Sequence, residues 1–461
     1  MKTYQDLIEN GSNPQFVIKA IEDYRVSDIY RWAIEGKAYS NWQNSTIMKY
    51  KKMLFKVTGE AIPDMISPNH KCASNFFDKF NTQTVQYLLG NGITFNDDSL
   101  KSKLGTKTKK FDDQISDLAK NALIGGVAYG FFNMDHIEVF AADEFVPLFD
   151  EETGALRAGI RFWQIRSDKP LRATLYEEDG ITDIIKRDGT IEIMHEKRPY
   201  KYKISVTAAD GTEIMDGYNY PSFPIVPLWG NKKRQSALVG LKQSIDCYDL
   251  IKSGCANDMD EASLIYWTLE NCGGMDDIDL AEFRERMMTI KVANIDGDGG
   301  AKAEAHTMDV PYEGREAYLV RLENDMYRDA QALNAQSIAS GNITATAIRA
   351  AYQSLDDKCD EFEYCINQFI QGILALIGVD DDPTFKRNRV ANQSEETTMI
   401  LSAAQYLDDE TILKHLPFIS PDEIPFILKN REKEEMDRYV NSPEGDQMTE
   451  DANNDDGGSE D

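Results

Sequence analysis

The residues best suited to chemistry are three closely spaced acids, Asp276, Asp277 and Asp279. Two-metal nucleases hold their ions between carboxylates that converge on a separation of about 4 Å. Neighbouring acids in an expected loop do not establish that convergence. A second acidic segment, Asp296 to Gly299, has the first residues of a calcium loop but lacks the further acids and the closing Glu. An acidic metal-dependent nuclease, or another DNA-processing enzyme, remains the alternative interpretation.

Other catalytic patterns are missing from the sequence. It contains no Walker motif, no G-x-S-x-G elbow and no H-E-x-x-H pair. The five histidines are scattered, and no two cysteines form a C-x-x-C pair, so the spacing of a zinc site is absent. We predict no catalytic residue, no metal and no cofactor, and any ATP hydrolysis would belong to a partner. Reduced, mostly buried thiols are expected at Cys72, Cys247, Cys255, Cys272, Cys359 and Cys365.

The charge of the chain argues against tight DNA binding. Its 461 residues include 79 acidic and 50 basic side chains, for a net charge of -29, whereas proteins that grip DNA neutralise phosphates with a basic face. An acidic surface past which DNA could slide is still compatible with this charge. The densest basic cluster has no interleaved aromatic residues for base stacking and predicts a solvated loop. Its members are Lys101, Lys103, Lys107, Lys109 and Lys110.

The first half of the chain predicts helices followed by an antiparallel β segment. Helix-like spacing covers residues 1–90, including Ile47, Leu54 and Val57, and a further helix is predicted over 111–123. Short alternating runs then fill 127–229 between Asp-Gly pairs, which are strong hairpin signals. Those pairs are Asp179-Gly180, Asp188-Gly189, Asp210-Gly211 and Asp216-Gly217.

Long helices dominate the second half. An apolar stripe predicts a helix over 235–261, and its polar counterpart includes Asp246, Asp249 and Ser253. A mixed segment with a short helix over 280–288 precedes a second long helix. The longest helix is predicted over 345–377, roughly 50 Å at 1.5 Å per residue. We expect the apolar stripes of these long helices to bury against neighbouring subunits.

We expect no targeting signal at the start of the chain and no membrane-spanning segment within it. Residues 1–10 are polar, and the most apolar stretch, 369–379, is shorter than the roughly 20 residues that span a bilayer. We therefore expect a soluble protein made in a cytoplasm. From Pro443 onward the chain is acidic and of low complexity, which predicts disorder.

Between residues 43 and 439 the order of short motifs resembles that of portal proteins of tailed double-stranded DNA bacteriophages, of the long-tailed siphophage type. Where that family often has Ser-Gly at the start of its long helix, this chain has Ala345-Thr346. The matching elements are Asn75-Phe76-Phe77, Tyr87-Leu88-Leu89-Gly90, Gly126 to Tyr129, Ile225 to Leu228 with Asn231, the set Asp246, Tyr248, Ser253, Asn257 and Asp258, and Gly341 to Ile348.

The resemblance implies an α+β portal fold with a helical and β-rich wing, a two-helix stem, a small α/β clip, a long spanning helix and a helical crown. The implied boundaries are wing 1–231 with its β-rich part at 127–230, stem helices 232–261 and 314–336, clip 262–313, tunnel loop 337–344, long wing helix 345–379, crown 380–440 and disordered acidic tail 441–461.

It also implies a structural, non-enzymatic function in the virion after assembly in the host cytoplasm. Family members form a dodecameric ring at one capsid vertex, through which double-stranded DNA is packaged and ejected. The implied partners are the terminase large subunit, a head-completion adaptor, and the major capsid and scaffolding proteins, with no membrane. The candidate site residues are Ser340, Gly341, Asn342, Ile343 and Thr344 in the tunnel loop, and Lys242, Asp246, Asp249 and Ser253 on a channel-lining stem face.

Overall fold

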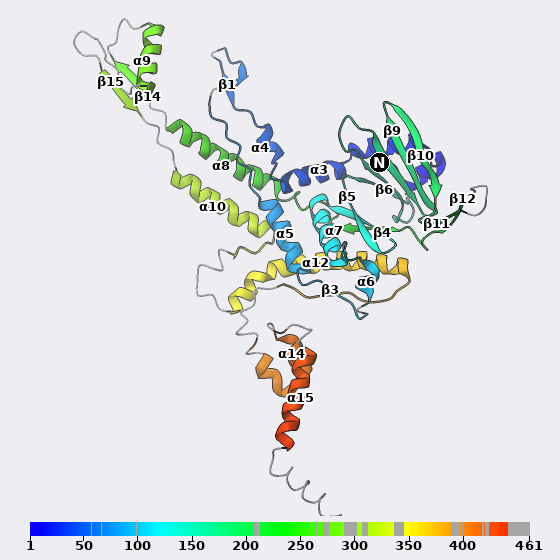
Figure 1. The fold of residues 1–461 in the computed structure, drawn as a ribbon. Helices are drawn as coiled ribbons and strands as arrows, with labels where there is room; N and C mark the ends of the chain where they lie inside the picture. Colours follow the sequence, from blue (N-terminus) through cyan, green and yellow to red (C-terminus); the bar gives the residue numbers. More distant parts are fainter. Residues whose placement is uncertain are drawn as a thin grey trace, which may run out of the picture. The chain divides into compact units, whose positions relative to one another are not determined.

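The chain divides into two units, Met1–Asn388 and Arg389–Asp461, and each is described by itself. The computed structural model describes residues 1–56, 58–65, 67–97, 99–206, 213–262, 266–270, 276–289, 302–306, 312–335, 345–388, 397, 400–416, 419 and 424–440. Both the predicted tunnel loop, 337–344, and the predicted acidic tail, 441–461, lie outside the described residues. Helices and strands are mixed throughout the first unit, which confirms the α+β class (Figure 1).

Helices fill most of the first 125 residues, as predicted. Asn13 caps α2 through a hydrogen bond from the backbone N–H of Gln15, and Gly126 ends α7 in the left-handed conformation at φ 89°. The helices are α1 Tyr4–Asn10, α2 Pro14–Arg25, α3 Asp28–Ser40, α4 Ser45–Lys49, α5 Phe76–Leu89, α6 Leu100–Leu104 and α7 Phe111–Gly125.

Between α4 and α5 the helical prediction is wrong. Leu54 lies in β1 (Met53–Phe55), which pairs antiparallel with β2 (Ala61–Pro63), and Val57 lies outside the described residues. The apolar residues that suggested helical spacing here belong to a hairpin. A short strand β3 (Ile93–Thr94) follows α5.

The predicted β segment is confirmed, but it forms separate sheets. One has the order β10-β9-β8-β7-β6, a second β13-β4-β5, and β11 pairs with β12 alone. Asp188 and Gly189, both at positive φ, form the two-residue turn between β9 and β10. The strands are β4 Val127–Asn133, β5 His136–Ala141, β6 Phe145–Phe149, β7 Leu156–Trp163, β8 Leu171–Glu177, β9 Gly180–Arg187, β10 Thr190–Arg198, β11 Lys201–Val206, β12 Glu213–Tyr218 and β13 Ile225–Trp229.

One of the four predicted Asp-Gly turns is wrong. Asp216 and Gly217 lie inside β12, where they pair with Lys203 and Tyr202 of β11. The pairing of the two strands continues through the Asp-Gly pair, so the local turn preference does not decide its conformation. Residues 210 and 211 lie outside the described residues.

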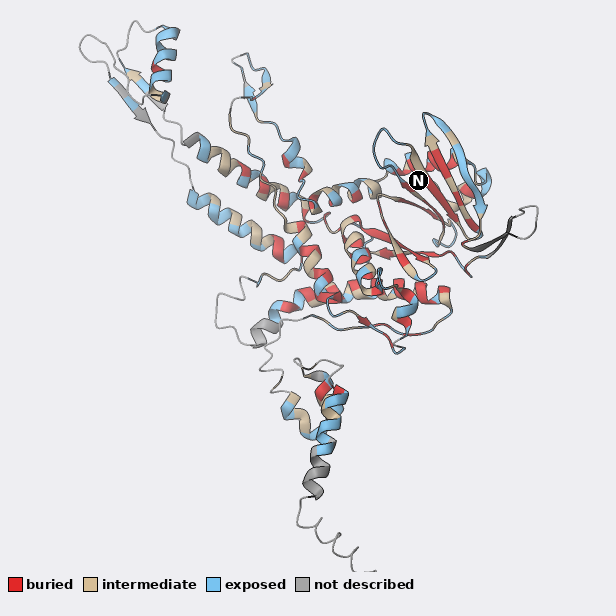
Figure 2. Cartoon of the chain, viewed as in Figure 1, coloured by how far each residue is buried: buried red, intermediate tan, exposed pale blue. Residues whose placement is uncertain are grey.

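The long helix α12 (Ala345–Ile377) has the predicted bounds, but its apolar stripe is buried inside its own chain. Ile366 and Phe369 are almost fully buried in a core shared with α5, α7 and the β13-β4-β5 sheet (Figure 2). A Cβ added at Gly130 of β4 would lie 2.4 Å from the Phe369 ring. The expectation that this stripe packs on a neighbouring subunit is therefore wrong, because a sheet of the same chain covers it.

The two predicted stem helices are present but shorter than predicted. The first, α8, spans Lys242–Ala262 and starts seven residues later than expected. Ser236 explains this start: its hydroxyl donates to the carbonyl of Ile124 at 2.6 Å and accepts from the N–H of Leu238 at 3.2 Å. These bonds tie residues 236–238 to the end of α7, so the buried Leu238 precedes the helix.

The second, α10 (Tyr312–Asp329), ends seven residues before the predicted boundary. Gln331 has a positive φ of 52°, and the side chain of Gln83 bonds both the N–H and the carbonyl of Leu333, each at 2.9 Å. The backbone of Leu333 is thus paired with α5 instead of a helical neighbour. Between α8 and α10, the predicted short helix is confirmed as α9 (Asp277–Thr289), beside the strand pair β14 (Tyr266–Glu270) and β15 (Lys302–His306).

The region predicted as the crown divides between the two units. Strand β16 (Thr384–Phe385) pairs with β3, so residues 380–388 belong to the first unit. In the second unit Asp408 caps α14, and Arg431 of α15 forms an ion pair with Asp409 at 3.0 Å. Its described elements are a 3-10 helix η1 (Ala404–Tyr406), α14 (Asp409–His415) and α15 (Ile424–Val440).

Candidate functional site

The candidate site is the polar face of α8. Polar residues recur along this helix every three or four positions, a spacing that places them on one side. They face the end of α3 and the segment of residues 44–72, which we name the arm. Residues 57 and 66 of the arm lie outside the described residues. The polar residues of α8 that bond to α3 or the arm are Lys242, Asp246, Asp249, Ser253, Asn257 and Asp260.

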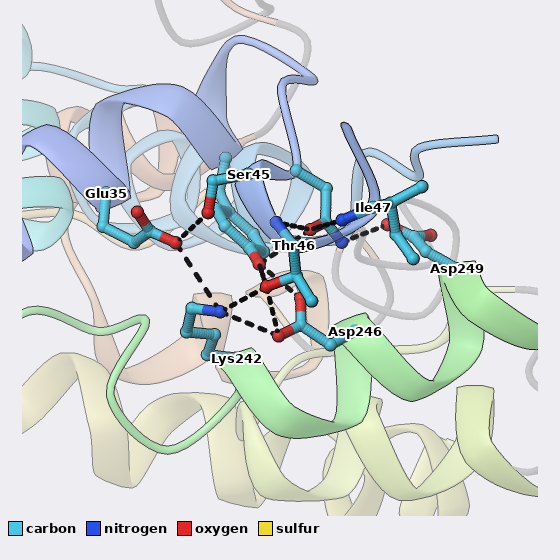
Figure 3. Close-up of polar contacts among 9 residues, drawn as sticks. Glu35, Ser45, Thr46, Ile47, Lys242, Asp246 and Asp249 are labelled. Atoms are coloured by element: carbon cyan, nitrogen blue, oxygen red, sulfur yellow. Dashed lines mark hydrogen bonds and ion pairs between the residues drawn. The ribbon is translucent and has the colours of Figure 1, made fainter. Parts of the chain in front are cut away.

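At the start of α8, Lys242 and Asp246 form a closed set of polar bonds (Figure 3). The Lys242 ammonium donates to Asp246 Oδ2 at 2.7 Å and to Thr46 Oγ1 at 2.8 Å, and lies 3.6 Å from Glu35 Oε1. Asp246 also accepts hydrogen bonds from the hydroxyls of Thr46 and Tyr39. Both charges are therefore compensated within the chain.

One turn further along α8, Asp249 meets Asn44. The carboxylate of Asp249 has no exposed surface, and its Oδ2 accepts a hydrogen bond of 2.7 Å from Asn44 Nδ2. The oxygen of the same Asn44 amide accepts from the N–H groups of Thr46 and Ile47 and so caps α4. A single side chain thus starts α4 and joins it to α8 (Figure 3).

Three further contacts hold the other end of the arm. Cys72 donates its backbone N–H to the hydroxyl of the buried Ser253 at 3.0 Å. The backbone N–H of His70 donates to Asn257 Oδ1 at 2.6 Å, and its ring nitrogen contacts the Asp260 carboxylate. The arm is therefore bonded to α8 at both of its ends.

The surroundings shift three pKa values at this face. Burial raises the pKa of Asp249, and the nearby polar groups of Ser74 and Asn44 offset only part of that increase. Burial, together with the hydrogen bond to Asp246, raises the pKa of Tyr39 to about 12. For Lys242, burial alone would lower the pKa, but the hydrogen bonds to Asp246 and Tyr39 outweigh it and raise the pKa. Lys242 is therefore charged and Tyr39 neutral at neutral pH.

This arrangement is suited to fastening one segment to another. Most of its donors and acceptors bond within the chain, although the second carboxylate oxygen of Asp249 is buried without a hydrogen-bond partner. In the described ranges no three His, Cys, Asp or Glu side chains gather as a metal site requires. At the acidic run first considered for metal binding, Asp276 accepts from the N–H groups of Ile278 and Asp279 and caps α9. Asp276 therefore has a structural role as a helix cap. The described residues give no support to the nuclease alternative.

The structure brings together all four predicted residues of α8, and their contacts are with the arm and α3. Their role in lining a channel stays a prediction. Ser340, Gly341, Asn342, Ile343 and Thr344 lie outside the described residues, and their role stays a prediction as well. In the lysine cluster, Lys101 pairs with Asp112 at 2.7 Å and Lys103 with Asp97 at 3.5 Å, as a solvated surface would. The five described cysteines are free, as predicted, but the expectation that most are buried is wrong, because Cys72, Cys247 and Cys255 are only half-buried.

The residues that meet α8 were not predicted from the sequence. Asn44 could have been identified as a helix cap, because Asn before Ser-Thr is a common start signal. The hydrogen bond from Asn44 to Asp249 could not have been predicted, because Asp249 lies 205 positions away in the chain. Tyr39 and His70 carried no local signal at all.

Comparison with known proteins gives matches that cover most of this chain. The sequence profile of a family described as "Phage portal protein, SPP1 Gp6-like" matches residues 22–439. A relative named "Portal protein" from Clostridium phage phiCD119 is 28% identical over 294 residues, 61% of this chain and 63% of the relative. Another "Portal protein", from Bacillus phage SPP1, is 24% identical over 436 residues, 88% of this chain and 84% of the relative. The match thus spans less than two thirds of the first relative.

Two solved structures also resemble the chain. The "Neck of native GTA particle computed with C12 symmetry" has a TM-score of 0.38 at 11% identity, and the "Neck of empty GTA particle computed with C6 symmetry" has a TM-score of 0.41 at 12% identity. Each match covers 74% of this chain and 88% of the other. Within the part of the chain that the structure describes, no helix is both long and apolar enough to cross a membrane.

Proposed function

Because this chain belongs to the family of phage portal proteins, SPP1 Gp6-like, we propose that it forms a dodecameric ring at one vertex of the capsid. The ring serves as the channel through which double-stranded DNA enters during packaging and leaves during ejection. It acts as a structural part of the virion and not as an enzyme. The family match over residues 22–439 carries this proposal.

The exposed apolar residues of α8 and α10 support assembly. Soluble proteins rarely leave large apolar side chains exposed in groups unless a partner covers them. On α8 these are Leu250 and Met259, and on α10 they are Tyr312, Tyr318 and Val320. In a ring, neighbouring chains can cover these side chains.

The charge of the chain supports a passive conduit. With a net charge of -29, a ring presents a mostly acidic surface to the duplex, and like charges remove the attraction that would hold DNA in place. The uncharged residues Ser340 to Thr344 fit a loop that follows the DNA without gripping it. Energy for translocation would come from a partner with its own ATPase.

The partners follow the family in this proposal. Residues 262–313, with α9 and the β14–β15 pair, would bind the terminase large subunit and later a head-completion adaptor. The major capsid and scaffolding proteins would contact the ring during assembly in the host cytoplasm.

Native mass spectrometry and negative-stain microscopy of the purified full chain test the ring. The expected result is the mass of a closed ring of subunits, together with annular particles that have a central channel. A monomer of 52.2 kDa at micromolar concentration, with no annular particles, would refute the proposal. Terminase pull-down with a chain in which residues 277–289 carry altered surface charges would then test the clip.

A further inference from the structure

The arm has an unusual composition for this protein. It contains five lysines, at positions 49, 51, 52, 56 and 71, against the acids Glu60 and Asp64, in a chain with a net charge of -29. It also exposes large apolar side chains, and Met65 is 90% exposed. The other exposed apolar residues of the arm are Met48, Tyr50, Met53 and Leu54.

The hairpin of the arm needs a cover. Strands β1 and β2 pair only over Met53↔Pro63, Leu54↔Ile62 and Phe55↔Ala61, and a two-stranded hairpin is marginally stable by itself in water. Its edges are unsuited to adding another strand, because Pro63 lacks a donor and lysines flank β1. The element that covers the hairpin therefore packs against its side chains, as a helix can.

The two ends of the arm are fixed to one face of α8, through Asn44 to Asp249 and through Cys72 to Ser253. Helix α10 meets a different side of α8, where Arg315 pairs with Asp258. The helical spacing places Asp258 on another side of α8 from Asp249 and Ser253. The arm and α10 of one chain thus flank α8 on separate sides.

A complementary surface lies on α10. Tyr312, Glu316 and Val320 are four residues apart, so they form one exposed stripe, with Glu313 beside it. All three arginines of α10 pair with acids: Arg315 with Asp258, and Arg321 and Arg328 with Asp325. Among the described residues neither Glu313 nor Glu316 forms an ion pair. This stripe offers exposed carboxylates between apolar side chains.

We propose that the arm of one chain packs on the Tyr312–Val320 stripe of α10 in a neighbouring chain. Leu54 covers Val320, while Lys49 and Lys51 pair with Glu313 and Glu316. This interface rests on the proposed ring, which supplies the neighbouring copy. The match of a basic apolar arm to an acidic apolar stripe favours a second copy of this chain over a nucleic acid, because DNA would not cover the apolar side chains.

Cross-linking between differently tagged chains tests the contact. One chain carries Leu54→Cys and the other Val320→Cys, and the two are mixed, assembled and oxidised. The expected product is a disulfide-linked heterodimer that carries both tags. The control pair, Ile8→Cys with Val320→Cys, starts from a position on α1 that is more exposed than Leu54, at 64% against 42%, and should give no product above the background from native cysteines.

A charge exchange tests the pairing. Lys51→Glu should weaken association roughly two- to fivefold per contact, and Glu316→Lys in the same chain should restore it. Lys107→Glu is the matched control, since it makes the same charge change in the other basic cluster and should leave assembly unchanged.

Normal rings that give no heterodimer overturn this interface and leave the proposed ring intact. Wild-type chains that form no ring refute the proposed function itself. Normal rings from Lys51→Glu that lose DNA retention would make the arm a DNA surface and overturn the proposal.

Discussion

Asn44 and Asp249 lie 2.7 Å apart, amide nitrogen to carboxylate oxygen, and join the start of α4 to the middle of α8. The same amide caps α4, so a local signal for starting a helix also places the arm. Because Asp249 is fully buried, this bond is its principal compensation for lost hydration.

Replacing Asn44 should therefore cost more than the loss of an ordinary cap. In Asn44→Ala we expect a loss of about 2–4 kcal/mol in the free energy of unfolding, about 1 from the cap and the rest from the unpaired carboxylate. Urea unfolding followed by circular dichroism measures it. Asn13→Ala is the control, since Asn13 caps α2 and should cost about 1 kcal/mol. Equal losses for the two variants would contradict a special role for Asn44.

The raised pKa of Asp249 predicts a pH dependence. A carboxyl that holds its proton more tightly when folded contributes stability that is present below its unfolded pKa and lost as the pH rises through its folded pKa. Asp249→Asn cannot ionise and still accepts from Asn44. It should therefore exceed the wild type in stability by a margin that grows between about pH 4 and pH 7. Melting temperatures across that range measure the margin.

Asp183 provides a control, because its pKa is shifted in the opposite direction from that of Asp249. Burial alone would raise its pKa, but hydrogen bonds from Arg198 and Thr174 outweigh the burial and lower it. Its stabilising contribution is thus present above the unfolded pKa and lost as the pH falls. Asp183→Asn should be less stable than the wild type at neutral pH, and this deficit should shrink in acid. Two margins that change in the same direction with pH would show that the assignment to Asp249 is wrong.

The contact of Gly130 with Phe369 predicts a compensating pair. Gly130→Ala places a methyl group 2.4 Å from the ring, so β4 or α12 must shift, at a cost of about 1–3 kcal/mol. In the Phe369→Leu background the smaller side chain leaves room for the methyl group, and the cost of Gly130→Ala should fall below about 1 kcal/mol. Urea unfolding of the four proteins in the cycle measures this difference. Additive losses would mean that the two residues do not press on each other.

The sequence correctly predicts the elements whose bounds are set by their own pattern of residues. The bounds of α12 are correct because its apolar spacing is continuous from Ile348 to Ile377, and the end of α7 because Gly126 stops it. The predictions that failed concern segments fixed by distant partners. Ser236 bonds to α7 and delays the start of α8, and Leu54 pairs with Ile62 in a hairpin.

For the site, the sequence identifies the polar face of α8 but not what it meets. Asp246 and Asp249 lie on one side of the helix whatever their environment, since helical spacing alone places them there. Their partners Tyr39 and Asn44 lie about two hundred positions earlier. Helical spacing gives no information on that pairing, so the contact between this stripe and the arm could not be predicted from the sequence.

The last prediction concerns the predicted tunnel loop and rests on its sequence and the proposed ring. Residues 337–346 are small or uncharged, and Gly341 permits backbone conformations that other residues resist. In a ring, Asn342→Lys would place about twelve positive charges around the duplex, one for each chain. Each neutralised phosphate strengthens binding that depends on salt. The variant should therefore form rings but package DNA poorly, and higher salt should relieve the defect.

A packaging assay with purified rings at low and high salt measures this effect. Asn10→Lys adds the same charge to the exposed end of α1, and Lys107→Glu changes the charge of the basic cluster; both should package as the wild type does. These controls separate a local effect at the loop from a change in the total charge of the ring. If Asn342→Lys rings package normally at low salt, residue 342 does not lie on the path of the DNA. If they fail equally at every salt concentration, the lysine disturbs assembly and not the sliding of DNA.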